Sequence, residues 1–195
     1  AAISHNLALR RDGSVLAWGN PGIPTYNTNL SGLSNAIDIA AGNYGNLALR
    51  KDGTVWVSPG SRILLSTNLS NRVAIAVNNF ASMALKQDGT VTLSGGFGKN
   101  PPPMLSNVTA IAIGGVQSEF GVALIGDGSP AMTLHPLSQV VKKGDVVQLH
   151  ARAVGVQPMS YQWQLENQNI PGATNGSLLI TNMQGKNTGN YRMFA

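Results

Sequence analysis

Short runs in which apolar and polar residues alternate fill the chain up to about residue 130, and they predict β-strands. The stretch Asn46–Ser58, NLALRKDGTVWVS, has two such runs on either side of an Asp-Gly pair. Asp-Gly between alternating apolar runs is among the strongest signals of a β-hairpin. The stretch therefore predicts two antiparallel strands joined by a type I′ turn, in which both central residues have positive φ.

The same hairpin pattern occurs four times. Its turn aspartates, which are separated by 40, 36 and 39 residues, are Asp12, Asp52, Asp88 and Asp127. Each of the later hairpins follows a run in which Ala alternates with Ile or Val, such as Val73–Val77. Such small apolar strands suit close packing between neighbouring sheets. A repeat of about 40 residues with three or four strands is one blade of a β-propeller.

The repeated turn aspartates raise the alternative of a metal site. One carboxylate per hairpin cannot assemble the shell of about 6–8 oxygens that calcium takes. We therefore predict that each Asp shapes its own turn through its own backbone, and we expect neither a metal nor a cofactor.

The order of an Ala-Ile strand, a short loop and the motif L-A-L-x-x-D-G-x-V-x-A-W-G resembles the regulator of chromosome condensation repeat. The short-period bacterial branch, which includes a secreted β-lactamase inhibitory protein, is most similar. The first repeat keeps Ala17-Trp18-Gly19, whereas Ser58-Pro59 and Ser94-Gly95 replace Trp-Gly in the next two. The resemblance covers about residues 1–128 and implies a propeller domain over 1–130.

The resemblance also implies an incomplete ring. That family usually closes about seven blades, and four repeats cover little more than half of such a ring. Two interpretations stay open: the chain is a fragment of a longer protein, or it is a homo-oligomer in which other copies close the ring. In both, the terminal blades would present open faces of Ala, Ile and Val.

Residues 131–195 have a different pattern, in which the Asp-Gly period stops. The runs are Gly144–Gly155 (GDVVQLHARAVG), Tyr161–Trp163 (YQW) and Asn187–Tyr191 (NTGNY). They resemble an immunoglobulin-like domain of the kind found in bacterial exported proteins. The fold class is therefore predicted as all-β: a partial β-propeller of about four repeats plus a truncated immunoglobulin-like β-sandwich.

The resemblance assigns roles to four residues of this second domain. Trp163 would be the buried tryptophan of strand C, and Tyr191 the tyrosine-corner residue of strand F. The family's cysteine positions fall on Ala151 and Met193, which would fill that space without a bond. The last strand is lacking, so strand F would be an open edge, ready for strand addition.

Composition and charge narrow the choice of partners. Charged residues make up 11% of the 195 residues, against about 25% in typical soluble proteins. The net charge is +5, but the basic residues are scattered, and nucleic-acid binding needs a clustered patch; we expect no nucleic-acid partner. No apolar run approaches the ~20 residues of a membrane helix. The absence of cysteine excludes disulfides and thiol catalysis.

Residues that could carry catalysis are few and scattered. His5, His135 and His150 show no metal-binding spacing, and His150 should point away from the sandwich core because its neighbours on the strand point inward. Nucleophile, phosphate-loop and dinucleotide motifs are absent. Asp38, within a strand, is expected to form a hydrogen bond to the next blade. We therefore expect the chain not to be an enzyme.

Aromatic residues in the loops between the first and second strands of each blade are the strongest binding candidates. They are Tyr44, Phe80 and Phe120, while Ser4 takes the equivalent place in the first repeat. Such loops line one rim of a propeller, and in the related inhibitory protein their aromatics contact the target enzyme. Two interpretations stay open: the rings anchor a partner, or each packs on its neighbouring blade.

The leading functional prediction is a non-enzymatic binding or adhesion module of an exported or cell-surface bacterial protein. The propeller rim would bind a protein or a glycan. Two alternatives stay open: an accessory region of a larger secreted hydrolase, and a propeller-type enzyme inhibitor.

Overall fold

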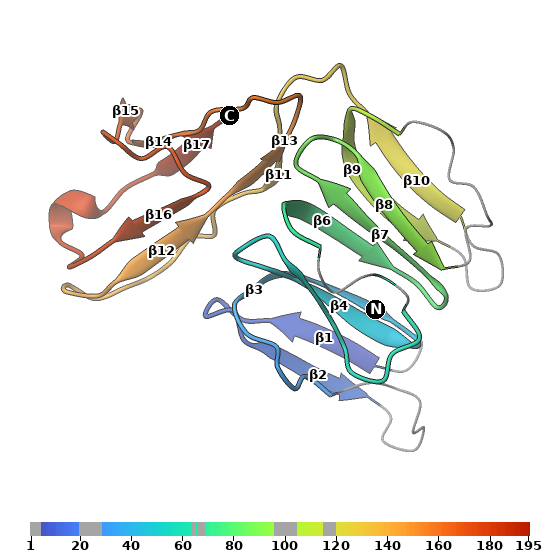
Figure 1. The fold of residues 1–195 in the computed structure, drawn as a ribbon. Coiled ribbons are helices and arrows are strands. Elements are labelled where there is room, and N and C mark those ends of the chain that lie inside the picture. Colours follow the sequence, from blue (N-terminus) through green and yellow to red (C-terminus); the bar gives the residue numbers. More distant parts are fainter. Residues whose placement is uncertain (1–4, 20–28, 64, 66–68, 96–104, 115–119) are drawn as a thin grey trace.

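The computed structural model describes residues 5–19, 29–63, 65, 69–95, 105–114 and 120–195. The chain is all-β, and its described helical structure is one 3₁₀ turn, Gly185–Asn187. Small twisted sheets stand side by side in the first part of the chain, and a sandwich follows at one end of them (Figure 1). The arrangement is a partial propeller with an appended sandwich, as the repeat pattern predicts. The domain boundary at residue 130 stays a prediction.

Four antiparallel sheets make up the propeller part. The first sheet pairs β1 (His5–Leu9) with β2 (Val15–Gly19). The second has the strand order β3 (Ala36–Gly42), β4 (Gly45–Arg50), β5 (Val55–Val57), and the third has the order β6 (Arg72–Val77), β7 (Ala81–Lys86), β8 (Val91–Gly95). The fourth pairs β9 (Val108–Gly114) with β10 (Phe120–Ile125). Each repeat therefore contributes one sheet, in sequence order.

The Asp-Gly turns differ from the predicted type I′ turn. In the second hairpin the N–H of Gly53 donates to Arg50 O at 2.9 Å, and Arg50 N–H donates to Thr54 O at 2.9 Å. The glycine alone has positive φ, 81°. This geometry is a three-residue loop, a type I turn closed by a glycine bulge. The type I′ prediction was wrong because the loop contains one residue more than the two that such a turn connects.

The aspartates shape these turns through their own backbone, as predicted. Asp52 Oδ1 accepts hydrogen bonds from Thr54 N–H at 2.9 Å and from Thr54 Oγ1 at 2.6 Å. Asp12, Asp88 and Asp127 likewise accept from the residue two positions on.

One backbone hydrogen bond is repeated between successive blades. The carbonyl of each turn glycine accepts from the first N–H of the next blade's first strand. The bonds run from Ala36, Arg72 and Val108 to Gly13, Gly53 and Gly89, at 3.1, 3.0 and 3.0 Å. The Asn that precedes each donor has φ of 55°, 57° or 55°, a left-handed conformation that Asn tolerates better than most residues.

Apolar packing between blades buries the middle strands. Leu47, Leu49 and Val55 of the second blade share a buried cluster with Ile75 and Ala84 of the third. Strand β10 has only β9 beside it among the described residues, and Val122, Leu124 and Ile125 remain 55–64% exposed. Burial therefore depends on a neighbouring blade, because each sheet is too thin to cover both of its faces.

The sandwich contains the remaining strands. They are β11 (Ala131–Leu134), β12 (Val147–His150), β13 (Arg152–Val154), β14 (Gln162–Leu165), β15 (Gln168–Asn169), β16 (Ser177–Ile180) and β17 (Tyr191–Phe194). β11 pairs with β13, β12 with β16, and β14 lies between β15 and β17. β17 has its other edge free of strand pairing among the described residues.

The core of the sandwich contains the residues that the resemblance assigns to it. Trp163 is fully buried, and its Nε1 donates to Asn175 O at 2.8 Å. Ala151 and Met193 belong to the same cluster. Tyr191 OH donates to Asn187 O at 2.7 Å, a bond back to a residue four positions upstream, as expected of a tyrosine corner.

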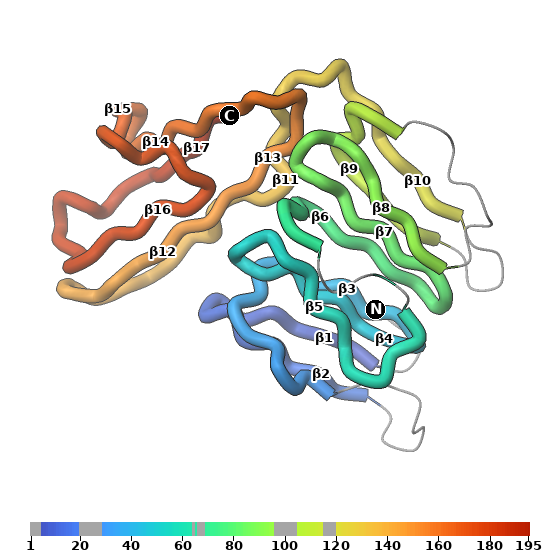
Figure 2. The backbone as a smooth tube through the Cα atoms, viewed as in Figure 1, coloured from blue at the N-terminus to red at the C-terminus, as the bar shows by residue number. Residues whose placement is uncertain are grey.

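The sandwich packs against the turn end of the propeller. Strands β11 and β13 lie beside β6 and β9 (Figure 2), and Ala131 and Val154 share an apolar cluster with Val73, Leu85 and Val108. Val156 N–H donates to the carbonyl of the fourth turn glycine, Gly128, at 3.1 Å. At this hydrogen bond the sandwich takes the place that the next blade takes in the repeats before it.

Candidate functional site: the aromatic rim

Two predicted site residues lie in contact on neighbouring blades. Tyr44 lies between β3 and β4, and Phe80 lies between β6 and β7. Their ring centroids are 5.0 Å apart with an interplanar angle of 37°. Phe80 is nevertheless 50% exposed. The rings therefore pack on each other across two blades, as the second interpretation predicts, and Phe80 stays half-exposed. That the rings anchor a partner stays a prediction.

A third side chain, that of Arg62, packs on this pair, and the sequence did not single it out. The guanidinium carbon of Arg62 lies 5.2 Å from the centroid of the Tyr44 ring, within cation–π range. Arg62 N–H also donates to Tyr44 O at 3.0 Å, which ties the two loops together. Arg62 lies in a variable connector outside the repeat motif, so periodicity gave no signal for it.

The Phe80 loop is held by Asn78. Its Oδ1 accepts from the N–H groups of Phe80 and Ala81 at 3.1 and 2.9 Å, and its Nδ2 donates to Gly114 O at 3.2 Å. Gly114 belongs to the fourth blade. One amide side chain therefore sets the loop conformation and links it to the next blade along the rim.

Phe120 takes a different place from the other two aromatics. It pairs with Gly114 as Gly45 pairs with Gly42, which puts it one position later in the loop than Tyr44 and Phe80. A Cβ on Gly114 would come within 2.5 Å of Phe120 Cζ, so the ring lies directly over that glycine. Phe120 is 55% exposed. Ser4 and Glu119 lie outside the described residues.

The histidines do not converge. His5 is buried, and its Nε2 lies 2.7 Å from Asn46 Oδ1 across the first two blades. His150 points away from the sandwich core, as predicted, but it is half-buried against the propeller. Burial and the positive charges of Lys51 and Arg152 lower the pKa of His150 to about 4. No group of three or more metal-ligating side chains is present in the described parts of the chain.

Among the residues that the structure describes, Asp38 forms no hydrogen bond to the next blade, contrary to the prediction. Its Oδ1 accepts from the N–H of its own neighbour Ile39 at 2.8 Å, beside a bulge in β3. Burial raises the pKa of this carboxyl. The prediction was wrong because the bulge lets the side chain turn back onto its own strand.

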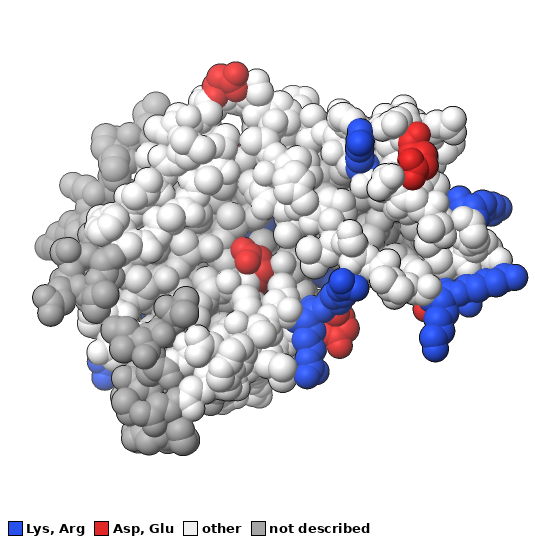
Figure 3. All heavy atoms as spheres, turned by 180° about the vertical axis from the view of Figure 1, so that it is seen from behind, with Lys and Arg blue, Asp and Glu red and all other residues white. Residues whose placement is uncertain are grey.

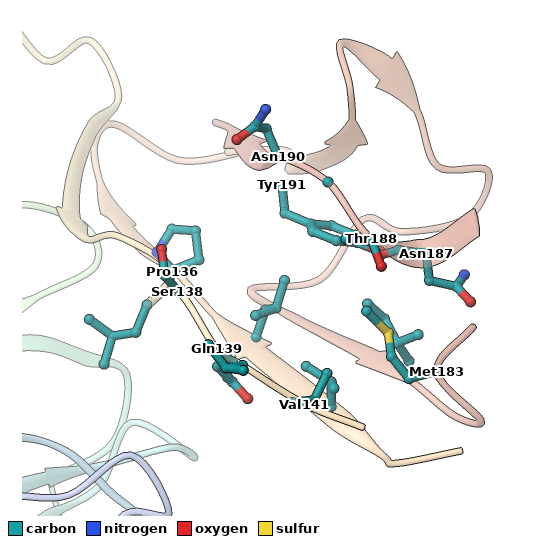
Figure 4. Close-up of a pocket in the computed structure, with 15 residues that line it drawn as sticks. Pro136, Ser138, Gln139, Val141, Met183, Asn187, Thr188, Asn190 and Tyr191 are labelled. Carbon is teal, nitrogen blue, oxygen red and sulfur yellow. The ribbon is translucent and has the colours of Figure 1, made fainter. Parts of the chain in front are cut away.

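A groove on the sandwich is a second candidate surface. It has a volume of about 500 Å³ and lies between the segment 136–141 and the segment 187–191 (Figure 4). Val147, Leu149 and Ile180 form its apolar floor. Tyr191, the first residue of β17, is among its lining residues. The sequence predicts strand addition at the open edge of that strand.

Comparisons with known proteins agree with this architecture. A family model described as immunoglobulin domain matches residues 129–195. The crinkly WD40 ectodomain of the receptor kinase ACR4 from Arabidopsis thaliana is similar in structure, with a TM-score of 0.51 and 18% identity, over 80% of this chain and 50% of that chain. A chain in the structure of Kap60 bound to yeast RCC1 (Prp20) has a TM-score of 0.46 and 19% identity, over 64% and 40%.

These comparisons concern the fold. The chain is an all-β protein with a partial β-propeller and an immunoglobulin-like sandwich. It spans half or less of the length of these two solved chains. A search of the curated proteins finds no matching sequence. Among the described residues, no helix is long and apolar enough to cross a membrane.

Proposed function

We propose that this chain is a non-enzymatic binding module of an exported or cell-surface protein, and that its propeller repeats are of the short bacterial regulator of chromosome condensation type. The rim at Tyr44, Phe80 and Arg62, with Phe120 on the next blade, binds a protein or a glycan. The sandwich acts as a spacer. The observation that carries this proposal is the contact between the Tyr44 and Phe80 rings, which leaves Phe80 half-exposed.

The chemistry of the rim suits recognition. Tyrosine and arginine are enriched at the residues that dominate binding energies, and a ring that is already held loses little entropy on binding. The Asn78 bonds and the Arg62 bond hold the loops before any partner arrives. The preformed loops lower the entropic cost of association.

The test is a binding screen of the whole chain against immobilised glycans and candidate secreted enzymes, including β-lactamases. We expect Tyr44→Ala and Phe80→Ala each to weaken binding of any partner found by about tenfold or more, since removal of an aromatic anchor costs about 2 kcal/mol. Phe194→Ala is the matched control, because Phe194 is similarly exposed, at 53%, but lies on the sandwich. Equal affinities of the wild type and the three variants for a partner would show that the rim does not take part in binding. Inhibition of an enzyme would favour the inhibitor alternative.

We also propose that a second copy of the chain covers the open face of the fourth blade. The exposed side chains of Val122 and Leu124 on β10 support this, because the equivalent residues of the inner blades, Leu47, Leu49, Met83 and Leu85, are buried. Such a face is unfavourable in water when uncovered.

A further inference from the structure

A small cavity between the propeller and the sandwich is lined by basic side chains. It lies where the β1–β2 turn and the β4–β5 turn approach β12 (Figure 1). Arg10, Arg11 and Lys51 come from the propeller turns, and His135 and His150 from the sandwich. The cavity has a volume of about 60 Å³.

The charged side chains that line this cavity are all basic. No carboxylate is among its described lining residues. Two carboxylates lie close by: the charge of Asp12 interacts with Arg10 and that of Asp52 with Arg152. Both also accept hydrogen bonds within their own turns, from Ser14 and Thr54. In the described structure neither Arg10, Arg11 nor Lys51 forms a salt bridge. Seen from behind, Lys and Arg side chains gather toward the sandwich and its junction, while most of the propeller face is uncharged (Figure 3).

His150 adds an unused polar atom to the cavity. Its Nε2 is buried and has no hydrogen-bond partner in the described structure. A buried ring nitrogen without a partner costs free energy that a bound acceptor would recover. The Arg152 guanidinium beside it is occupied, because it donates to Lys51 O and fixes the turn that carries Lys51.

We propose that this cavity binds a tetrahedral oxyanion, a phosphate or sulfate group, which joins the propeller to the sandwich. Arg10, Arg11 and Lys51 supply the positive charge, and the Nε2–H of the His150 ring donates a hydrogen bond to one oxygen. Gln148, which also lines the cavity, supplies a neutral donor. The binding energy comes from charge-assisted hydrogen bonds in a partly enclosed site, where solvent screens charges less than on an open surface. This inference is independent of the aromatic rim.

The test is calorimetric titration of the whole chain with inorganic sulfate and with inorganic phosphate, at constant ionic strength set by chloride. We expect saturable binding by the wild type. Lys51→Gln and Arg10→Gln should each weaken it about tenfold, since each removes one charged partner. The matched controls Lys142→Gln and Lys143→Gln remove exposed charges that do not line the cavity, and should bind as the wild type does.

A second measurement does not depend on the variants. Nuclear magnetic resonance titration of the His150 ring should show that saturating sulfate raises its pKa, because a bound dianion stabilises the protonated ring. Lack of saturable binding by the wild type, or equal affinity in Lys51→Gln, Arg10→Gln and the controls, would overturn the proposal. Tighter binding of a sulfated oligosaccharide than of free sulfate would identify the group as the end of a glycan, and weaker binding would identify it as a free anion.

Discussion

At the scale of single residues, the turn aspartates stabilise the hairpins by local hydrogen bonds. The Thr54 hydroxyl and N–H are the largest causes that lower the pKa of Asp52. The carboxylate is therefore favoured in the folded state, and its contribution is lost as the pH falls below its usual value of 3.8.

We predict that Asp52→Ala lowers the free energy of unfolding by roughly 0.5–1 kcal/mol, a modest loss because water screens this exposed turn. Urea denaturation near neutral pH measures it. Asp52→Asn keeps a side-chain oxygen for the N–H of Thr54 and should recover most of the loss. An Asn variant as unstable as the Ala variant would show that the charge, and not the turn bond, carries the effect.

The histidine at the domain junction gives a second prediction. Because the pKa of His150 is lowered from 6.5 to about 4, the unfolded chain takes up this proton before the folded chain does. Stability contributed by neutral His150 is therefore complete above pH 6.5 and is lost as the pH falls toward 4.

We expect His150→Gln to flatten the dependence of unfolding free energy on pH across that window, measured in urea without sulfate or phosphate. His135→Gln is the control, because His135 is an exposed histidine of the same domain, and it should keep the wild-type slope. An unchanged slope in His150→Gln would contradict the assignment.

At the scale of the elements, the contact between one turn and the next blade is the repeated joint of the propeller. A Cβ on Gly53 would lie 3.2 Å from Asn71 N, in the backbone that begins the next blade. Gly60 has a similar φ, 73° against 81°, but a Cβ there would have no atom within 4 Å.

We therefore predict different costs for the same substitution. Gly60→Ala should lower the free energy of unfolding by about 1 kcal/mol, the cost of a left-handed conformation for an L-residue. Gly53→Ala should lower it by at least about 1 kcal/mol more, because the added methyl group crowds the neighbouring blade. Chemical denaturation of the two variants side by side measures the difference. Equal losses would mean that the joint between the blades tolerates the extra carbon.

At the scale of the whole molecule, the turn and the sheet face of the fourth blade differ in what covers them. At the turn end the sandwich supplies the hydrogen bond from Val156 and the apolar contact of Val154. On the face of β10, Val122 and Leu124 stay exposed. The fourth blade is thus covered at its turns and open on its sheet.

We predict that the chain self-associates, so that its mass in light scattering rises above 20.4 kDa with concentration. Leu124→Glu should shift it toward the monomer, because burial of a charge at the contact is costly. Val146→Glu, at a site 65% exposed on the sandwich, should associate as the wild type does. A wild-type chain that stays monomeric when it is concentrated would contradict the proposal that a second copy covers this face.

Local sequence alone determined the strands, three hairpins and the identity of the sandwich core. A few residues are enough to predict each of these features. The alternation at Leu47 and Leu49 and the Asp-Gly pairs act on near neighbours, and Trp163 is set by burial. Even so, the number of residues in each turn loop was misjudged, because Asp-Gly suits more than one turn type. The fourth Asp-Gly pair, Asp127-Gly128, does not join a hairpin, because β11 after it pairs with β13 of the sandwich and not with β10.

The tertiary structure decided what distant residues do to one another. The Tyr44–Phe80 contact, the place of Arg62 over the Tyr44 ring and the basic cavity at His150 depend on how closely separate blades and the sandwich approach. Phe120 also lies one position later in its loop than Tyr44 and Phe80 do in theirs, because the strand register, and not the motif spacing, sets its place. Sequence encodes local conformation and burial strongly, but a contact across sheets depends on the sum of many small packing terms that no single motif carries.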